Sequence, residues 1–408
     1  MPPHIAIVGA GPTGLEAALA AADAGRSFTL YEAGDAVAEH LLRWQHVRLF
    51  SPWELDLSPR MRSHLAAAGR SAPSGEACPT GGALRAVLQQ IAALPAVNHR
   101  LRLGARVLAI GREGLLKHQA IANPARATHP FRLLVLGADG VECIEHADIV
   151  LDCTGTYGQP NATGDGGIPA PGEAALGARV RRQIPDFEAE EKTWAGQRIL
   201  LVGAGHSAQT AACDLQRLVL KRPGTGVVWA LRRTEAVWPA IEDDALPARS
   251  ALIAAAQQVA QAPPEGFCVH TGVVVERMAH DAHGIHATLR RQGGGCFEVA
   301  VDRIVSLTGF VPDHQLYRQL QVHECYATCG PIKLAAALLG ESSSDCLEQS
   351  SHGADTLANP EPGFFILGAK SYGRNATFLM RVGWQQVAEV FALLAEVGDA
   401  RVAGEVAV

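Results

Sequence analysis

Short apolar runs alternate with longer helical stretches along most of the chain. The first apolar run covers residues 4–9 and the next covers residues 28–31, with an alanine-rich stretch from Leu15 to Ala24 between them. Gly25 follows that stretch, as is common just past the end of a helix. Short buried strands separated by helical segments are typical of α/β folds. The pattern therefore predicts an α/β protein.

The same arrangement recurs further along the chain. A strand is predicted over residues 198–202, a helix from Gln209 towards Val219, and another strand over residues 226–231. The remaining predicted elements are strands over residues 148–155, 303–310 and 363–369 and a helix over about residues 376–394. Two strand–helix–strand units thus indicate two Rossmann-like domains.

Residues 156–197 are rich in glycine, proline and alanine, which indicates a connection between domains. We therefore expect a discontinuous first domain into which a second domain is inserted. The expected boundaries are residues 1–160 and 303–396 for the first domain, 161–195 for a linker, 196–302 for the second domain and 397–408 for a C-terminal tail.

A glycine-rich segment, Gly9-Ala10-Gly11-Pro12-Thr13-Gly14, stands between the first predicted strand and the first predicted helix. Gly9 permits a tight turn, Gly11 lets a pyrophosphate approach the backbone, and Gly14 lets the helix pack on the strand. The helix N-terminus offers free N–H groups and the positive end of its dipole to phosphates. Glu32 ends the next strand at the distance from which a carboxylate binds a ribose diol. This context predicts a dinucleotide site, which we assign to FAD.

A second glycine-rich segment, Gly203-Ala204-Gly205-His206-Ser207-Ala208, follows the predicted strand over residues 198–202. Ala208 replaces the third glycine, a substitution that this turn tolerates. The next strand ends on Arg232 and Arg233 instead of an acid. Paired guanidinium groups bind a 2′-phosphate, so NADPH is expected in preference to NADH; the alternative is that both arginines are solvated surface charge. His206 is expected to line the pyrophosphate site or to face solvent, without a chemical role.

Two other segments carry candidate chemistry. Residues 43–53 hold two tryptophans, a histidine and two arginines in an expected loop, where Ser51 and Trp53 are candidate catalytic residues and Arg48 a candidate cofactor ligand. The alternative is that the aromatic side chains are core residues. Lys370 is a third candidate, because a cation beside a reduced flavin favours its anionic form. The helix expected after Asn375 would point its dipole at the flavin.

The order of these segments resembles the two-dinucleotide-binding-domain flavoproteins, and within them the flavin-containing-monooxygenase-like class B branch. The resemblance rests on both glycine segments, on Thr154-Gly155, on Arg232-Arg233, on Leu307-Thr308-Gly309-Phe310 and on the segment around Gly368. It implies a three-layer β-β-α FAD domain with an inserted NADPH domain. It also implies that the FAD site includes Arg48, Val107, Thr154, Gly155, Gly368, Lys370 and Thr377. The implied reaction is oxygenation of a small soft nucleophile by O₂ through a flavin C4a-hydroperoxide, with NADPH as reductant.

Some signatures of that branch are absent, so two other functions stay open. The Phe-x-Gly-x-x-x-His-x-x-x-Trp signature and a Gly-Gly-x-Trp after the second strand are missing. One alternative is an NADPH-dependent reductase of the disulfide-reductase type, with a thiol relay through Cys325, Cys329 or Cys346. The other is a non-catalytic flavin redox sensor. The substrate pocket is expected between residues 43–65 and the loop 340–360.

The composition of the chain indicates which classes of binding partner to expect. The chain has 408 residues and a net charge of −6, without a long basic block, which argues against nucleic-acid binding. No apolar run is long and clean enough to span a bilayer. A strand that begins near His4 leaves no room for a secretory leader, so we expect a cytoplasmic enzyme. The nine cysteines stand singly, which favours free thiols over a metal site. A homodimer is compatible with this composition.

Overall fold

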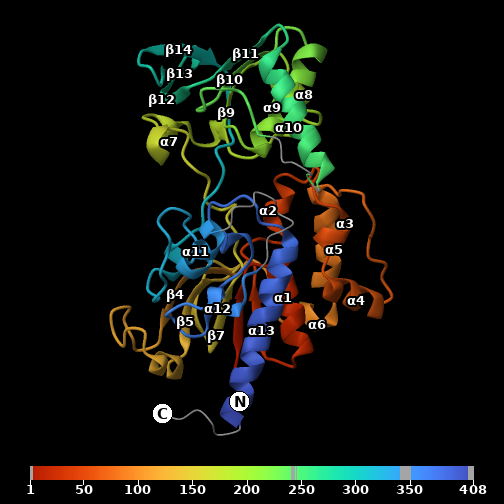
Figure 1. The fold of residues 1–408 in the computed structure, drawn as a ribbon, viewed down its shortest axis with the longest axis vertical. Coiled ribbons are helices and arrows are strands. Elements are labelled where there is room, and N and C mark those ends of the chain that lie inside the picture. Colours follow the sequence, from red (N-terminus) through yellow and green to blue (C-terminus); the bar gives the residue numbers. More distant parts are fainter. Residues whose placement is uncertain (1–2, 240–243, 245, 341–350, 403–408) are drawn as a thin grey trace. The chain divides into compact units, whose positions relative to one another are not determined.

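The computed structural model describes residues 3–239, 244, 246–340 and 351–402. By its internal contacts the chain divides into two compact units (Figure 1). The first unit comprises Met1–Gln159 and Val311–Val408, and the second unit comprises Pro160–Phe310. In the described part of the chain, no helix combines the length and the apolar character needed to cross a membrane.

A five-stranded parallel sheet forms the centre of the first unit. Its order is β16 (Phe364–Ile366), β7 (Ile149–Asp152), β1 (Ile5–Val8), β2 (Phe28–Tyr31) and β3 (Leu101–Arg102). All neighbours run parallel, with Val8 opposite Tyr31 on one side and Asp152 on the other. The carboxyl ends of the central strands therefore meet at one edge of the sheet. The residues that follow them (Gly9, Glu32, Cys153 and Leu367) begin the loops of the candidate site.

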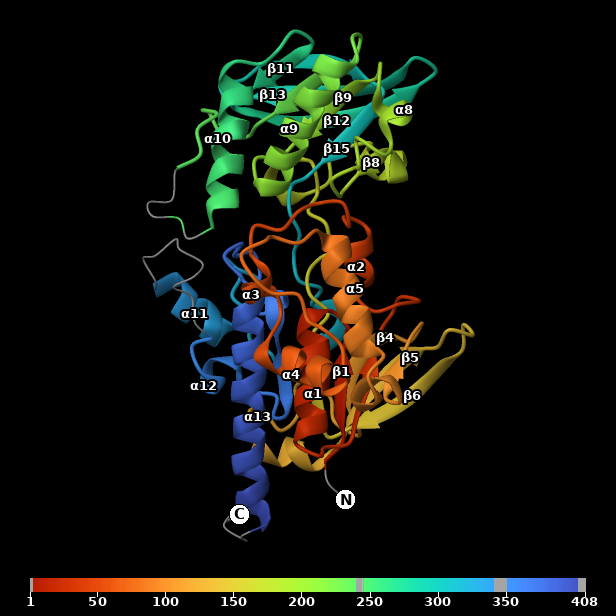
Figure 2. The same cartoon turned by 90° about the vertical axis from the view of Figure 1, so that its right-hand side faces the viewer.

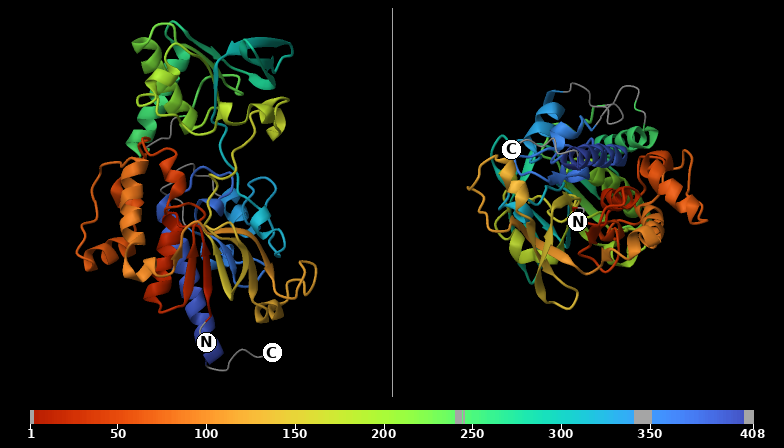
Figure 3. Two further views of the ribbon diagram at one scale, coloured as in Figure 1. Left: turned by 180° about the vertical axis from the view of Figure 1, so that it is seen from behind. Right: turned by 90° about the horizontal axis from the view of Figure 1, so that it is seen from below.

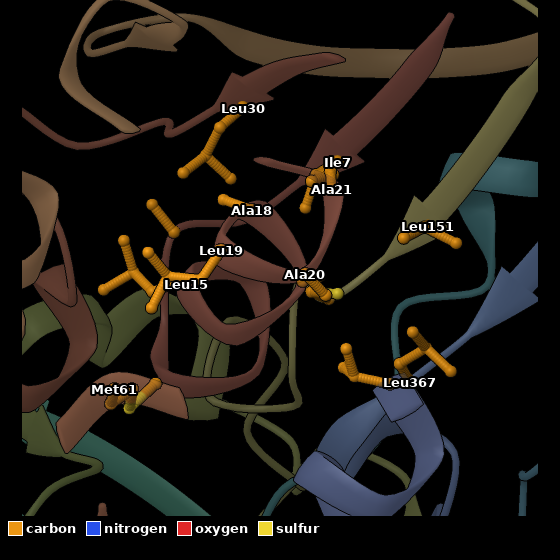
Figure 4. Packing of buried hydrophobic residues seen from close by; sticks show 14 of the residues in the cluster. Ile7, Leu15, Ala18, Leu19, Ala20, Ala21, Leu30, Met61, Leu151 and Leu367 are labelled. Atoms are coloured by element: carbon orange, nitrogen blue, oxygen red, sulfur yellow. The ribbon is translucent and has the colours of Figure 1, made fainter. Parts of the chain in front are cut away.

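Alternating side chains of β1 face two different layers, and Figure 4 shows the packing of one of them, which contains Ile7, Leu15 and Leu19. Ile5 and Ile7 are fully buried in a cluster with α1 (Pro12–Asp23) and α13 (Met380–Val402), whereas Ala6 and Val8 belong to a cluster on the opposite face. That period of two is what a strand buried on both faces requires. α1 and α13 lie side by side over the first face (Figures 1 and 2). Each fully buried leucine of this layer contributes about 1.5–3 kcal/mol.

An antiparallel meander covers the second face of the sheet (Figure 3). Its strands are β4 (Arg106–Arg112), β5 (Phe131–Leu136) and β6 (Glu142–Ala147). The first unit thus has three layers, meander, parallel sheet and helices, as the resemblance implied. Its other helices are α2 (Glu39–Leu42), α3 (Trp53–Asp56), α4 (Pro59–Ala67), α5 (Gly81–Ala92), α6 (Pro95–Asn98), α11 (Ile332–Gly340) and α12 (Ala354–Leu357).

The second unit repeats the design. Its parallel sheet has the order β11 (Phe267–His270), β10 (Gly226–Ala230), β9 (Arg198–Val202), β15 (Arg303–Ser306) and β8 (Val180–Arg181). A separate antiparallel sheet is formed by β12 (Val273–Asp281), β13 (Gly284–Arg291) and β14 (Cys296–Val301). The helices are α7 (Glu173–Leu176), α8 (Glu191–Trp194), α9 (His206–Lys221) and α10 (Pro247–Gln261).

Three expected boundaries differ from the structure. The expected linker, residues 161–195, belongs to the second unit, because β8 pairs with β15 and α7 packs against β12. Residues 303–310 also belong there, since Ile304 and Val305 are fully buried partners of β9. The expected tail begins inside a helix, because α13 continues to Val402. The glycine- and proline-rich composition of residues 161–195 concealed their short strand and helices.

Candidate functional site

The first glycine turn joins β1 to α1 through a close backbone contact. A Cβ atom added at Gly14 would stand 1.8 Å from the carbonyl oxygen of Gly9, so only glycine fits there. Helix α1 begins at Pro12, and its N-cap Gly11 offers no side-chain acceptor to the first-turn N–H groups. A Cβ atom added at Gly11 would meet nothing within 4 Å. The turn is therefore closed towards the protein and open at Gly11, where free N–H groups and the helix dipole suit an anion.

The side chain of Glu32 is bound to the backbone of the first glycine turn. Its carboxylate accepts hydrogen bonds from the N–H of Ala10 at 3.0 Å and of Gly34 at 2.9 Å. Burial raises the pKa of Glu32, while these N–H groups work in the opposite direction. Each carboxylate oxygen keeps a lone pair for a further donor, as a ribose diol would require.

Segments from the middle and the end of the chain complete the edge beside this turn. Thr154 donates from its backbone N–H and its hydroxyl to Asp152, which ends β7. Gly368 packs against Thr13, because a Cβ atom there would lie 2.6 Å from the Thr13 hydroxyl oxygen. The N–H of Gly368 donates to Gln386 of α13 at 2.8 Å. Gly155 follows Thr154 in the left-handed region, with φ of 68°. The structure thus brings Thr13, Thr154 and Gly368 to one edge, although they lie far apart in sequence.

Lys370 has buried partners that its position in the sequence did not indicate. Its ammonium donates to Asp152 at 2.7 Å and to the Thr154 hydroxyl at 3.0 Å, and the side chains of Lys370 and Asp152 are fully buried. The structure thus shows Lys370 in a buried ion pair, and a direct contact between Lys370 and a flavin stays a prediction. A buried carboxylate at a strand end needs a paired cation, and Lys370 supplies it. Its effect on the site acts through Thr154.

The last helix starts later than expected. α13 begins at Met380, not near Ala376, so its N-terminus is not formed by Asn375. The Asn375 side chain instead accepts from the N–H and hydroxyl of Thr377, closing a local turn before the helix. Thr377 therefore lies in this turn, and a helix dipole directed from residue 376 is not present.

The segment 43–53 contains more local structure than a loop. Arg48 donates to the carbonyl of Cys78 at 2.5 Å, so its guanidinium is engaged with the backbone of its own unit. Trp53 starts helix α3. Both Trp53 and Trp44 pack against the core. These contacts agree with the alternative that the aromatic residues of this segment pack into the core.

Ser51 has a buried partner that was not among the expected site residues. Its hydroxyl donates to Asp56 at 2.5 Å, and the other oxygen of Asp56 is buried without a hydrogen-bond partner in the described part of the chain. Burial raises the pKa of Asp56 to about 7, against the lowering effect of the Ser51 hydrogen bond. The pair can therefore hold or release a proton near neutral pH. Only the five-residue spacing linked the two positions in sequence.

Val107 lies on β4, opposite Val135 and next to a bulge. Its side chain is buried in the cluster between the meander and the parallel sheet. Any contact with a cofactor would therefore come from its backbone, not from its side chain.

The second glycine turn joins β9 to α9 in the same manner. Gly203 has a φ of 132°, and a Cβ atom there would lie 2.3 Å from the carbonyl oxygen of Leu307. A Cβ atom added at Gly205, the N-cap of α9, would meet nothing within 4 Å. The methyl group of Ala208 is buried beneath the turn, while Ser207 is exposed in the first turn of the helix. This turn, too, is open at its middle glycine.

His206 is the first residue of α9. Burial lowers the pKa of His206, and the nearby charge of Arg249 lowers it further. The expectation that His206 has no chemical role stays a prediction.

Arg232 and Arg233 follow β10 at the edge that carries the second glycine turn. Arg232 is exposed, and its guanidinium has no hydrogen-bond or ion-pair partner among the described residues. Arg233 lies 5.2 Å from the ring centroid of Trp238 and donates to the carbonyl of Val237. Within the described part of the chain, the guanidinium of Arg232 is therefore unengaged, whereas that of Arg233 lies against an aromatic ring.

Two tryptophans fix the second glycine turn, and neither was expected to be part of the site. The indole N–H of Trp229 donates to the carbonyl of Gly203 at 2.9 Å, and that of Trp238 donates to the carbonyl of Ala204 at 2.7 Å. Their rings stack with centroids 5.6 Å apart. The apolar pattern predicted Trp229 in a strand, but no sequence signal indicated where its N–H points.

No family model and no curated protein matches the sequence, but solved structures do. The bacillithiol disulfide reductase of Bacillus cereus is 19% identical, with a TM-score of 0.70 over 97% of this chain and 99% of its own. The ornithine hydroxylase of Pseudomonas aeruginosa is 18% identical, with a TM-score of 0.62 over 97% and 99%. The ornithine N-hydroxylase of Kutzneria sp. 744 is 13% identical, with a TM-score of 0.64 over 97% and 100%. The chain has their fold. The predicted fold, two Rossmann-like domains with one inserted into the other, is confirmed.

Proposed function

We propose that the chain is an FAD-dependent oxidoreductase that oxidises NADPH, with FAD in the first unit and NADPH in the second. One observation carries the proposal. Each unit has a glycine turn at the carboxyl edge of a parallel sheet, and the turn is open at Gly11 or Gly205 but closed by backbone contacts elsewhere. Such turns bind the pyrophosphate of a dinucleotide at a helix N-terminus.

The residues around the first turn fit FAD. The N–H groups that begin α1 would bind its pyrophosphate, and Glu32 would accept from the ribose of its adenosine half. Thr13, Thr154 and Gly368 would line the same edge, with Thr154 held in place by Asp152 and Lys370. In our proposal Lys370 is thus a positioning residue.

The residues around the second turn fit NADPH. The N–H groups that begin α9 would bind the pyrophosphate next to Gly205, with His206 and Ser207 beside it. Arg232 would form a charge-assisted contact with the 2′-phosphate, and Arg233, held by Trp238, would complete the grip. An acid in place of these arginines would repel that phosphate.

For the reaction itself we propose oxygenation of a small soft nucleophile with O₂. FAD would supply the two-electron chemistry that links the oxidation of NADPH to the reduction of O₂. The Ser51–Asp56 pair would hold the proton that such a reaction returns to water, since the pKa of Asp56 is raised to about 7. Trp53, packed at the start of α3, would wall the site instead of reacting. Two of the structures with this fold are ornithine hydroxylases, which supports this choice.

A reductase of the disulfide-reductase type is the second candidate. It is favoured by the surface loop that contains Cys325 and Cys329, in which Arg374 donates to the sulfur of Cys329 at 3.3 Å. Cys346, the third thiol considered from the sequence, lies outside the described residues. A bacillithiol disulfide reductase also has this fold.

Rapid mixing tests these functions in order. Purified flavin-loaded protein mixed with NADPH without oxygen should lose its oxidised-flavin absorbance, and no loss would contradict both enzyme functions and leave a redox sensor. Oxygen is then admitted. A transient before the oxidised spectrum returns supports oxygenation, whereas immediate reoxidation with peroxide release supports the reductase. A cytoplasmic location and a homodimer remain part of the proposal; cell fractionation and light scattering test them.

A further inference from the structure

Residues 325–330 form a tight surface loop with a cysteine near each end, here called the dithiol loop. Glu324 and Pro331 pair as an antiparallel bridge at its base, and the N–H of Cys325 donates to the carbonyl of Gly330 at 2.8 Å. The N–H of Cys329 donates to the carbonyl of Cys325 at 2.7 Å. This hydrogen bond closes an α-turn, whose first and last Cα atoms lie roughly 6 Å apart, because four helical steps rise by about 1.5 Å each. Disulfides form over Cα separations of about 4.4–6.8 Å.

Each sulfur of the dithiol loop has hydrogen-bond donors beside it. The guanidinium of Arg374 donates from Nε to the sulfur of Cys329 at 3.3 Å. At Cys325, the backbone N–H and the hydroxyl of Thr328 lower the pKa of the thiol, and the N–H of Ala327 adds to the effect. A thiolate is the form that attacks a disulfide, and nearby donors and cations stabilise it.

Other cysteines of the chain have the opposite environment. Burial raises the pKa of the Cys213 thiol to about 11, and it also raises the pKa of Cys78 and of Cys153. Buried thiols without donors are inert. The two cysteines of the dithiol loop therefore differ from cysteines that only fill space in the core.

The dithiol loop packs on the segment that follows the proposed FAD site. The N–H of Arg374 donates to the carbonyl of Thr328 at 2.6 Å, and a Cβ atom added at Gly330 would stand 2.7 Å from the carbonyl of Ser371. Ser371 directly follows the short helix Gly368–Lys370. On its other side the loop faces solvent, since Tyr326 at its tip is 98% exposed. The thiols thus lie between the proposed cofactor segment and the surface.

We propose that Cys325 and Cys329 are a redox-active thiol pair that reduces a disulfide substrate at the surface of the first unit. Cys329 is the more accessible of the two, so its thiolate attacks one substrate sulfur. A mixed disulfide forms, the substrate S–S bond breaks, and one half leaves as a thiolate. The buried Cys325 thiolate then attacks the Cys329 sulfur, which releases the second half as a thiolate and leaves a Cys325–Cys329 disulfide.

Return to the dithiol requires two electrons and two protons. With FAD bound as proposed, NADPH and solvent would supply them, and in this step alone the inference rests on the proposed function. The inference names the two thiols that the reductase function would use, and it names a disulfide as the class of substrate.

Alkylation tests the thiol pair without relying on the flavin reaction. The full-length, flavin-loaded protein is treated with iodoacetamide near neutral pH, and the modified peptides are followed by mass spectrometry. Exposure alone would make Cys143, Cys268 and Cys296 react first, because all three are exposed. The proposal predicts that Cys329 reacts about 10-fold faster than these three because the guanidinium of Arg374 contacts its sulfur. Arg374→Gln should remove most of that advantage while Arg374→Lys keeps part of it. Faster modification of the exposed cysteines would overturn the proposal.

An anaerobic NADPH titration tests the electron transfer. Protein first oxidised with oxidised glutathione should consume about two equivalents of NADPH per flavin, one for the flavin and one for the disulfide. Cys325→Ser and Cys329→Ser should each consume about one, while Cys296→Ser and Cys346→Ser should still consume about two. One equivalent in every protein, or a loss confined to Cys346→Ser, would overturn the thiol pair and leave the proposed function intact. No flavin reduction at all would contradict the proposed function, and the alkylation result would still decide the thiol pair.

Discussion

The two glycine turns occupy equivalent positions in the two units, yet the chain completes them in different ways. In the first turn Gly14 has no room for a methyl group, whereas the second turn has Ala208 at the corresponding place. Glu32 accepts from the backbone of the first turn, and two tryptophan N–H groups donate to the backbone of the second. The first turn is thus tied to an acid and the second to aromatic donors beside an arginine pair.

In the proposed function, the turn would set where a dinucleotide binds, while the neighbouring side chains would set which one. A carboxylate at the strand end suits a ribose diol, and a guanidinium suits a 2′-phosphate. The residues that contact each turn also differ in how far along the sequence they lie from it. Gly368 reaches the first turn from the far end of the chain, whereas Trp238 belongs to the loop directly after β10.

The largest effect is expected at the closest contact. Gly14→Ala would drive a methyl group into the carbonyl of Gly9, a backbone clash that exceeds ordinary overpacking, which costs about 1–3 kcal/mol. We expect this variant to purify without FAD or not to fold, as followed by flavin absorbance and urea unfolding. Ala208→Gly is the matched control in the second turn and should cost about 1 kcal/mol without loss of FAD. Equal behaviour of the two variants would remove the distinction between the turns.

The two units should respond to pH in opposite directions. Burial raises the pKa of Asp56 to about 7, so the first unit gains stability in acid and loses it as the pH rises from about 4 to 7. Burial alone would raise the pKa of Asp244 as well, but hydrogen bonds from Arg249, Ser250 and the N–H of Leu246 lower it to about 2. The second unit therefore loses stability as the pH falls from about 4 to 2.

Hydrogen exchange read separately in each unit measures this pH dependence. Asp56→Asn should flatten the profile of the first unit between about pH 4 and 7, by up to about 4 kcal/mol at 1.36 kcal/mol per pH unit. Asp244→Asn should change only the second unit, below about pH 4. A slope in the first unit that survives Asp56→Asn would contradict the assignment.

A smaller effect is expected from the arginine pair. Replacing Arg232 and Arg233 together with alanine removes charge-assisted contacts worth about 1.5–3 kcal/mol, so kcat/KM for NADPH should fall about 10- to 100-fold. The value for NADH, which lacks the 2′-phosphate, should change less than about 2-fold. Steady-state kinetics with both cofactors gives the comparison. Equal losses for NADPH and NADH would mean that the arginines are solvated surface charge.

The smallest effect is expected at Trp238. Trp238→Phe keeps the ring beneath Arg233 but removes the donor to Ala204, which should cost about 1 kcal/mol and raise the KM for NADPH about 5-fold. Trp194→Phe is a matched control, because that indole N–H donates to Glu190 instead of the glycine turn. The control should leave the KM for NADPH unchanged. A KM that rises equally in both variants would point to general loosening of the second unit.

Much of this arrangement could be predicted from local sequence. The apolar runs around the two glycine segments gave β1, β2, β9 and β10 to within a residue or two, because short-range patterns determine such strands. The start of α13 could not be predicted, since the turn between Asn375 and Thr377 competes with a helix for the same N–H groups.

The contacts of single side chains were the least predictable. Lys370 pairs with Asp152, which lies 218 residues away, and Ser51 pairs with Asp56 inside a segment expected to be a loop. Both pairings depend on which groups the fold buries together. A linear pattern identifies that a charged residue is present at a site but not which partner satisfies it.

One measurement tests most directly whether the first turn binds FAD and the second binds NADPH. A valine at Gly11 or at Gly205 would touch no protein atom at its Cβ and would keep the extended backbone of each N-cap, but it would fill the space proposed for a pyrophosphate. Flavin content and anaerobic reduction by NADPH are measured for both variants. Gly11→Val should fold but purify without FAD, whereas Gly205→Val should retain FAD that NADPH no longer reduces. If Gly205→Val is reduced normally, or if Gly11→Val retains its FAD, the assignment of cofactors to the two turns is wrong.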